Sequence, residues 1–96
     1  MNIVIFGKVG CARCSTTKDK VNHLVTKLGM KDQVGIQFMD MDTVDGLAEG
    51  SYYDVFNIPV TIVSRQGQQL ARWDGVVPKS DELRLSLEGQ SGAAAG

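Results

Sequence analysis

Two cysteines, Cys11 and Cys14, are the residues of this chain whose type and spacing point most directly to chemistry. They form the run Cys11-Ala12-Arg13-Cys14 and are the only cysteines among 96 residues. At the start of a helix, this spacing brings two sulfur atoms close enough to bond. A thiolate attacks a disulfide of another molecule, and a second thiol then resolves the mixed disulfide that forms. The pair therefore predicts thiol–disulfide exchange through a redox-active disulfide.

The two thiols are expected to lie in different surroundings. Cys14 lies seven residues before Val21, so it shares the apolar stripe of a helix and is expected to be buried. Cys11 lies at or just before the first turn, where free backbone N–H groups and the helix dipole favour a thiolate. Lys8 and Arg13 add positive charge nearby. Cys11 is therefore the predicted nucleophile, and Cys14 the predicted resolving thiol.

A metal site is the main alternative interpretation of the cysteine pair. Zinc needs two further ligands, and the chain has one histidine, His23, nine residues after Cys14. On a helix His23 lies roughly 13 Å from Cys14 and on the opposite face, so no metal site within one chain is expected. Two alternatives stay open: a metal or iron–sulfur carrier whose cluster is shared between two chains, and an interaction module with a purely structural disulfide.

The hydrophobic pattern predicts an α/β domain around the pair. A continuous apolar run predicts a strand over Ile3–Phe6, and apolar side chains three and four residues apart predict a helix over Cys14–Leu28. The order β-α-β-α-β-β-α predicts a mixed four-stranded sheet with helices on both faces. The later elements are expected at Val34–Met41, Thr43–Phe56, a hairpin of Pro59–Val63 with Gln69–Trp73, and a helix opened by Lys79-Ser80-Asp81-Glu82.

The second and last helices carry weaker signals. Gly46 and Gly50 each lower the helix propensity of their segment by about 1 kcal/mol. Ser80 or Asp81 is expected to cap the last helix. The apolar residues on which these two helices are expected to centre are Leu47, Val55 and Phe56 in one, and Leu83, Leu85 and Leu87 in the other.

Length and composition set the remaining limits. Residues 1–88 are expected to form one domain, and residues 89–96 a disordered tail. A net charge of −1 argues against a nucleic-acid partner, and no apolar run approaches the roughly 20 residues of a membrane span. The N-terminal run lacks the features of a signal peptide. We therefore expect a cytoplasmic monomer, in a compartment where cysteine pairs serve catalysis more often than stability.

Three segments, in this order, resemble the glutaredoxin and thioredoxin family: Lys8-Val9-Gly10-Cys11-Ala12-Arg13-Cys14, Ile58-Pro59-Val60, and Trp73-Asp74-Gly75-Val76-Val77-Pro78. The last is similar to the Trp-x-Gly-x-x-Pro segment of the glutaredoxin-like redoxins that reduce ribonucleotide reductase. The resemblance implies a minimal thioredoxin fold over nearly the whole chain. It also implies an oxidoreductase of electron transport and cell redox homeostasis, with no bound cofactor and a disulfide-containing protein as substrate.

The resemblance also implies roles for single residues. Pro59 is expected to be a cis-proline that shapes the substrate groove with Ile58, and Gly75 to line that groove. Asp40 and Asp42 are expected to cap the second helix.

The positions of three aromatic residues predict their surroundings. Trp73 is expected to pack rather than contact substrate. Of Tyr52 and Tyr53, one is expected to pack and one to be exposed.

Lys8 and Arg13 allow two interpretations. Lys8, three residues before Cys11, matches the lysine that binds a glutathione carboxylate in glutaredoxins. Alternatively, Lys8 and Arg13 simply favour the Cys11 thiolate. Ala12-Arg13 replaces the Gly-Pro of thioredoxins and the Pro-Tyr of glutaredoxins, so the external reductant, thioredoxin reductase or glutathione, stays open.

Overall fold

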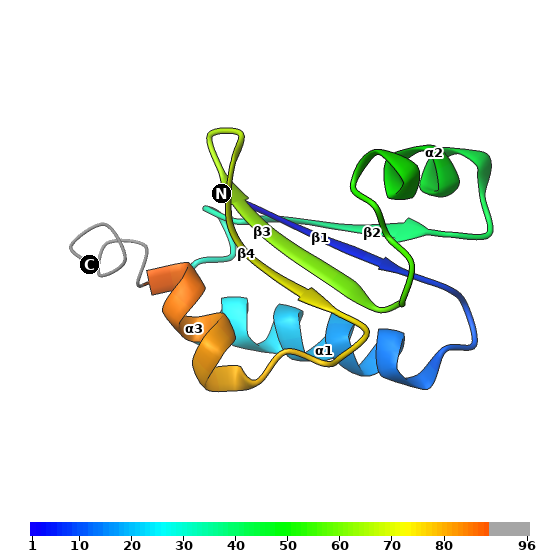
Figure 1. Cartoon of the computed structure of the whole chain (residues 1–96). Helices are drawn as coiled ribbons and strands as arrows, with labels where there is room; N and C mark the ends of the chain where they lie inside the picture. The colour runs from blue at the N-terminus through cyan, green and yellow to red at the C-terminus, as the bar shows by residue number, and fades with distance from the viewer. Residues whose placement is uncertain (89–96) are drawn as a thin grey trace.

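The computed structural model describes residues 1–88 as a four-stranded sheet with three helices (Figure 1). Residues 89–96, for which the sequence predicts a disordered tail, lie outside the described residues. The predicted order of elements is confirmed. The elements are β1 (Asn2–Gly7), α1 (Ala12–Lys27), β2 (Gly35–Asp40), α2 (Val44–Tyr52), β3 (Val60–Arg65), β4 (Gln68–Asp74) and α3 (Ser80–Glu88).

The sheet is mixed, as predicted, with the strand order β2-β1-β3-β4. β1 pairs parallel with β2 and antiparallel with β3, while β3 and β4 form the antiparallel hairpin. The two central strands are the apolar runs of the sequence because both of their faces are covered. Ile3 and Ile5 face one side of the sheet, and Phe6 faces the other.

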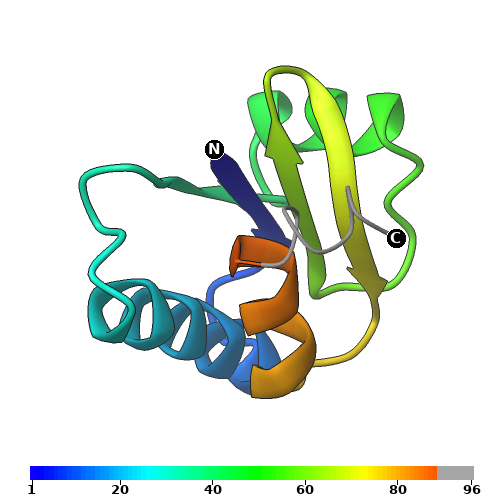
Figure 2. The ribbon, with the colours of Figure 1, turned by 90° about the vertical axis from the view of Figure 1, so that its left-hand side faces the viewer.

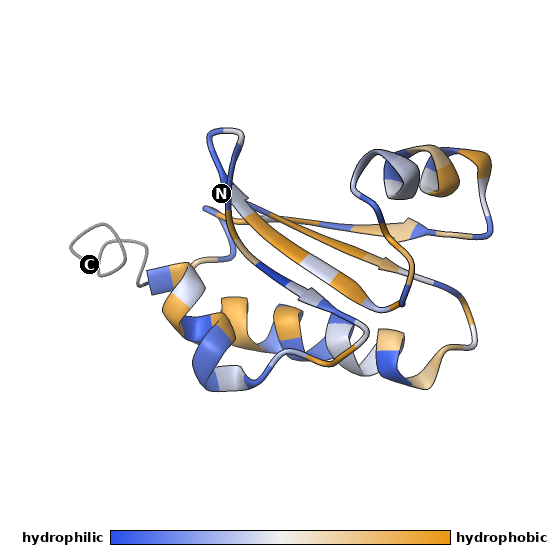
Figure 3. Ribbon diagram, in the orientation of Figure 1, coloured by the Kyte–Doolittle hydropathy of each residue, from blue (hydrophilic) through white to orange (hydrophobic). Residues whose placement is uncertain are grey.

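Helices cover both faces of the sheet, as predicted. α1 and α3 lie on one face and α2 lies on the other (Figures 1 and 2). The larger core, formed with α1 and α3, contains Ile3, Ile5, Val21 and Leu83, and the smaller core around Phe6 lies on the α2 side. In Figure 3 the central strands are largely hydrophobic, and hydrophobic and hydrophilic segments alternate along α1.

A side chain of α1 also binds the segment that leads into α3. Lys20 Nζ donates a hydrogen bond to the carbonyl oxygen of Pro78 at 3.0 Å. Its ammonium group therefore holds α1 beside the start of α3.

The second helix is shorter than predicted. α2 ends at Tyr52, and Asp54 then takes a positive φ of 55° that turns the chain out of the helix. Val55 is buried beyond the helix end, but Phe56 is 84% exposed and Leu47 is 54% exposed. The expectation that α2 centres on Leu47 and Phe56 was wrong: Leu47 is helical but exposed, and Phe56 lies beyond the helix end. An exposed apolar residue has the same sequence signal as a buried one.

The helix caps also differ from the prediction. Thr43 caps α2, since its Oγ1 accepts a hydrogen bond from Gly46 N at 3.0 Å. The carboxylate of Asp40 instead accepts from Asp42 N at 2.9 Å and stabilises the preceding turn. Neither aspartate caps the helix, because the closer threonine hydroxyl reaches its free N–H group.

The last helix begins at Ser80, so neither Ser80 nor Asp81 is its cap residue. Leu83 N donates to Lys79 O at 2.9 Å, so Ser80 and Asp81 are themselves helical. Leu83 and Leu87 are buried at helical spacing. Leu85 lies between them on the outer side and is 66% exposed.

The glycines that weaken the sequence signal of α2 have a packing role. A Cβ atom on Gly46 would overlap the backbone carbonyl of Asp40, and one on Gly50 would press on the side chain of Met41. Both glycines are buried. Their missing side chains therefore allow α2 to lie directly on the end of β2.

The substitution Gly46→Ala is expected to destabilise the protein. Helix propensity alone predicts a gain of about 1 kcal/mol from this change. The overlap with Asp40 reverses the sign, and we expect a loss of about 1–3 kcal/mol in the free energy of unfolding. Urea unfolding measures it, with Ser51→Ala at an exposed position of α2 as the control. A Gly46→Ala protein as stable as the parent contradicts the packing role.

Candidate functional site

The two cysteines form a disulfide at the N-terminus of α1, with their Cα atoms 5.2 Å apart. Cys11 is the N-cap residue of α1, and its Sγ accepts a hydrogen bond from Cys14 N at 3.2 Å. Cys14 is fully buried, whereas Cys11 is half-buried. The predicted difference between the two thiols is confirmed: one sulfur is accessible at the helix end, and the other lies in the core.

The depth of Cys14 depends on Gly7, the last residue of β1. A Cβ atom on Gly7 would lie 2.8 Å from both the Cβ and the Sγ of Cys14, which is too close for any side chain. The first turn of α1 therefore packs directly on the end of β1. Sequence reasoning missed this contact, because a glycine at a strand end also has the simpler meaning of a turn residue.

A chain of hydrogen bonds joins the three segments that resembled the redoxin family. The Ile58–Pro59 peptide bond is cis, as expected from that resemblance. Gly75 N donates to Pro59 O at 2.8 Å, and Arg13 Nη1 donates to Gly75 O at 2.9 Å. The start of β3, the loop after β4 and the first turn of α1 thus meet at one end of the sheet.

Glycine is required at position 75 by its backbone. Gly75 has a φ of 72°, a conformation that other residues rarely adopt. A Cβ atom there would also lie 3.1 Å from the Cβ of Asn57. The loop can therefore offer both its N–H and its carbonyl group to the neighbouring segments.

An open groove of about 460 Å³ lies beside the helix turn that carries the disulfide. It brings together Ile58 and Gly75, two of the three predicted groove residues, with Arg13, which the sequence placed only near the thiols. Pro59, the third, is fully buried and does not line the groove. The residues that line it are Arg13, Phe56, Asn57, Ile58, Asp74 and Gly75.

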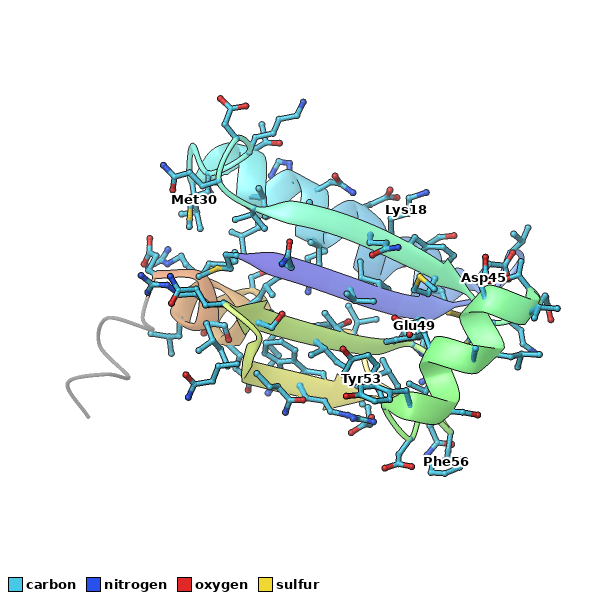
Figure 4. The ribbon with its side chains drawn as sticks, turned by 90° about the horizontal axis from the view of Figure 1, so that it is seen from above. Lys18, Met30, Asp45, Glu49, Tyr53 and Phe56 are labelled. Carbon is cyan, nitrogen blue, oxygen red and sulfur yellow. A yellow bond between two sulfur atoms is a disulfide. The ribbon has the colours of Figure 1, made fainter. Side chains whose placement is uncertain are left out.

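Exposed apolar side chains surround this end of the molecule. Val9 and Phe56 are each 84% exposed, and Val76 is 51% exposed. Val9 lies two residues before Cys11, Phe56 three before Pro59, and Val76 directly after Gly75. Phe56 projects away from the sheet beyond α2 (Figure 4). Sequence reasoning missed these residues, although each adjoins one of the three motif segments.

Lys8 and Arg13, the two cations near the cysteines, have different contacts. Lys8 Nζ lies 3.6 Å from Asp42 Oδ1, and both side chains are about half exposed or more. Arg13 instead extends to the Gly75 carbonyl. Only Arg13 is therefore brought together with the groove.

The predicted packing of Trp73 and the predicted difference between the two tyrosines agree with the structure. Trp73 packs against the larger core, and its Nε1 donates to Glu82 Oε1 at 2.9 Å. Tyr52 is exposed, and Tyr53 packs against Phe6 with ring centres 5.9 Å apart. His23 is exposed on α1.

Residues 1–88 show neither a metal-ligand cluster nor a membrane-spanning helix. In this part of the chain, no group of three or more His, Cys, Asp or Glu side chains is placed to hold a metal ion. None of its helices has the length and apolar character needed to span a membrane.

No family model and no curated protein matches this sequence. Solved structures do match its fold. Thioredoxin 1 from Thermosipho africanus superposes over all of both chains with a TM-score of 0.76 and 16% identity. The chain has the thioredoxin fold. Thioredoxin-2 of a malaria parasite matches 92% of this chain and 81% of its own, with a TM-score of 0.75 and 19% identity. Thioredoxin O2 from Arabidopsis thaliana matches 92% of this chain and 72% of its own, with a TM-score of 0.72 and 17% identity.

The thioredoxin fold expected from the sequence resemblance is thus confirmed. Within it, the disulfide lies where α1 begins, and the cis-proline starts β3. The loop at Gly75 connects these two segments.

Substituting Gly75 with alanine is expected to disturb this connection specifically. Alanine at a positive φ costs about 1–2 kcal/mol of stability. Gly67 has a φ of 80° in the β3–β4 turn with no atom near its missing Cβ, so Gly67→Ala is the matched control. Both variants are expected to lose similar stability in urea unfolding.

Only Gly75→Ala is expected to weaken the bond from residue 75 to Pro59. Amide hydrogen exchange at residue 75 is expected to become at least about tenfold faster than the loss of global stability explains. Equal exchange at that amide in the two variants contradicts the contact between Gly75 and Asn57 as the cause.

Proposed function

We propose that this protein is a dithiol–disulfide oxidoreductase that reduces disulfides of other proteins and so donates electrons to them. The observation that carries the proposal is the Cys11–Cys14 disulfide, with an accessible sulfur at the N-cap of α1 and a buried one behind it. The thioredoxin fold and the adjoining groove support it.

The reaction starts from the reduced protein. The Cys11 thiolate attacks one sulfur of the substrate disulfide, and the other substrate sulfur leaves as a thiolate and takes up a proton. Cys14, as a thiolate, then attacks the Cys11 sulfur of the mixed disulfide and releases the second substrate thiol. Two electrons pass to the substrate, and the Cys11–Cys14 disulfide forms. An external dithiol or thiol, supplied by thioredoxin reductase or glutathione, returns the two electrons.

The helix end assists the first step. The backbone N–H of Cys14 points at the Cys11 sulfur, and a hydrogen bond to a thiolate is stronger than one to a neutral thiol. The positive end of the α1 dipole acts in the same direction. A larger share of Cys11 is thereby present as the thiolate, the form that attacks the substrate disulfide.

The substrate is proposed to be an extended protein segment. The backbone next to Pro59 borders the groove, where an added segment can form main-chain hydrogen bonds. The exposed side chains of Val9, Phe56 and Val76 offer apolar contacts around it. We place the reaction in the cytoplasm, with the protein acting as a monomer.

The different burial of the two sulfurs distinguishes this proposal from its two alternatives. A cluster shared between two chains needs both thiolates at the interface, and Cys14 is fully covered against Gly7. A purely structural disulfide does not need an accessible sulfur, whereas Cys11 is only half-buried at the N-cap of α1. The geometry fits exchange chemistry better than either.

The two cysteines are expected to respond differently to substitution. Cys11→Ser should abolish reduction of a protein disulfide such as that of insulin, because the nucleophile is lost. Cys14→Ser should accumulate a mixed disulfide with the substrate, detected by mass spectrometry under non-reducing conditions. Equal loss of activity without a trapped adduct in Cys14→Ser contradicts the assigned roles.

The Cys11 thiol is expected to ionise more easily than a free cysteine. Because the Cys14 N–H and the helix dipole favour its charged form, its pKa should lie below about 8.5. The rate of alkylation against pH in Cys14→Ser, which has a single thiol, measures this value. The same protein unfolded in urea is the control, and an inflection no lower than the unfolded one overturns the expectation.

A further inference from the structure

We propose that Arg13 determines substrate specificity by binding a carboxylate within one or two residues of the cysteine that Cys11 attacks. The inference rests on the proposed function and adds a substrate class to it: disulfides flanked by Asp or Glu. It is carried by the position of the Arg13 guanidinium, its hydrogen bond and the charges around the groove.

Arg13 lies between the two cysteines and lines the groove together with Ile58 and Gly75. A substrate segment that delivers its disulfide to Cys11 and passes along Ile58 therefore runs beside Arg13. The cation is within reach of residues next to the attacked cysteine and not of distant parts of the substrate.

The charge of Arg13 has no carboxylate partner among residues 1–88. The other charged residue of the groove, Asp74, is bound by Arg72 Nε at 3.0 and 3.2 Å. Arg72 is in turn fixed by donating to the carbonyl oxygen of Tyr53. Across the site, Lys8 is paired with Asp42. Within the described chain, the groove is thus lined by one carboxylate that Arg72 compensates and by one guanidinium without a carboxylate partner.

The guanidinium is also held in place before substrate arrives. Its bond to Gly75 O at 2.9 Å uses one of five N–H donors. The remaining donors have the fork geometry that matches a carboxylate. Because the side chain is already ordered, binding a carboxylate costs less conformational entropy than it does for a free surface lysine.

Arg13 also lies close enough to Cys11 to affect its reactivity, so the test must separate recognition from reactivity. A ratio of rates for two substrates does this, because a change in Cys11 reactivity affects both rates alike. The substrates are two peptides of equal length, each closed by one internal disulfide, with Glu or Gln on both sides of one cysteine.

The experiment measures the second-order rate at which each peptide oxidises the reduced full-length protein, by acid quenching and chromatography. The parent protein is expected to prefer the Glu peptide by about fivefold at low salt, which corresponds to the upper end of the range for one exposed ion pair. The preference should fall as salt is added, because exposed charges are screened.

Arg13→Gln is expected to reduce the preference to about onefold, and Arg13→Lys to retain part of it. Lys18→Gln is the matched control, since it removes the same charge from α1. Lys18 lies with its Nζ over the Phe38 ring, beside β2 and on the opposite edge of the sheet from Phe56 (Figure 4). The Lys18→Gln variant should prefer the Glu peptide as strongly as the parent protein does.

The outcomes separate the two proposals. If neither peptide oxidises the reduced parent protein, and that protein reduces no protein disulfide, the proposed function is overturned. A parent that reacts with both peptides at equal rates, or an Arg13→Gln variant that keeps the preference, overturns the role of Arg13 and leaves the function intact. A loss of preference in Lys18→Gln also overturns it, because general charge then explains the effect.

Discussion

The contact between Cys14 and Gly7 is the constraint on which the rest of the site depends. With no side chain at residue 7, the first turn of α1 lies against the end of β1, and Cys14 fills the space. This depth leaves Cys11 at the helix cap, where the Cys14 N–H meets its sulfur. It also brings Arg13 within hydrogen-bond distance of Gly75 O. The accessibility of Cys11, the burial of Cys14 and the position of Arg13 at the groove therefore all depend on one close packing contact.

The mixed sheet determines why the three loops meet. β1 ends where β3 begins and β4 ends, since Phe6 pairs with Val60 and Val60 pairs with Asp74. An antiparallel arrangement at β3 places the end of one neighbour beside the start of the next. The cysteine turn, the cis-proline and the Gly75 loop thus share one end of the sheet without any long connection.

Local patterns explain what the sequence predicted, and long-range contacts explain what it did not. The period of α1 and the apolar runs of β1 and β3 report burial directly, so the element order and the different burial of Cys11 and Cys14 followed from them. Phe56 misled because an exposed apolar residue is indistinguishable from a buried one in sequence. The bond from Arg13 to Gly75 joins residues 62 positions apart, and no local pattern encodes it.

The two bonds from α1 to the segment before α3 share a property that bears on sequence change. Arg13 and Lys20 both donate to backbone carbonyl oxygens, those of Gly75 and Pro78. Every residue has such a carbonyl, whatever its side chain. Residue type at the acceptor therefore matters only through the backbone conformation, which at position 75 requires glycine. Substitution of Arg13 or Lys20 removes its contact outright, whereas a substitution at Pro78 that preserves the backbone conformation leaves the acceptor in place.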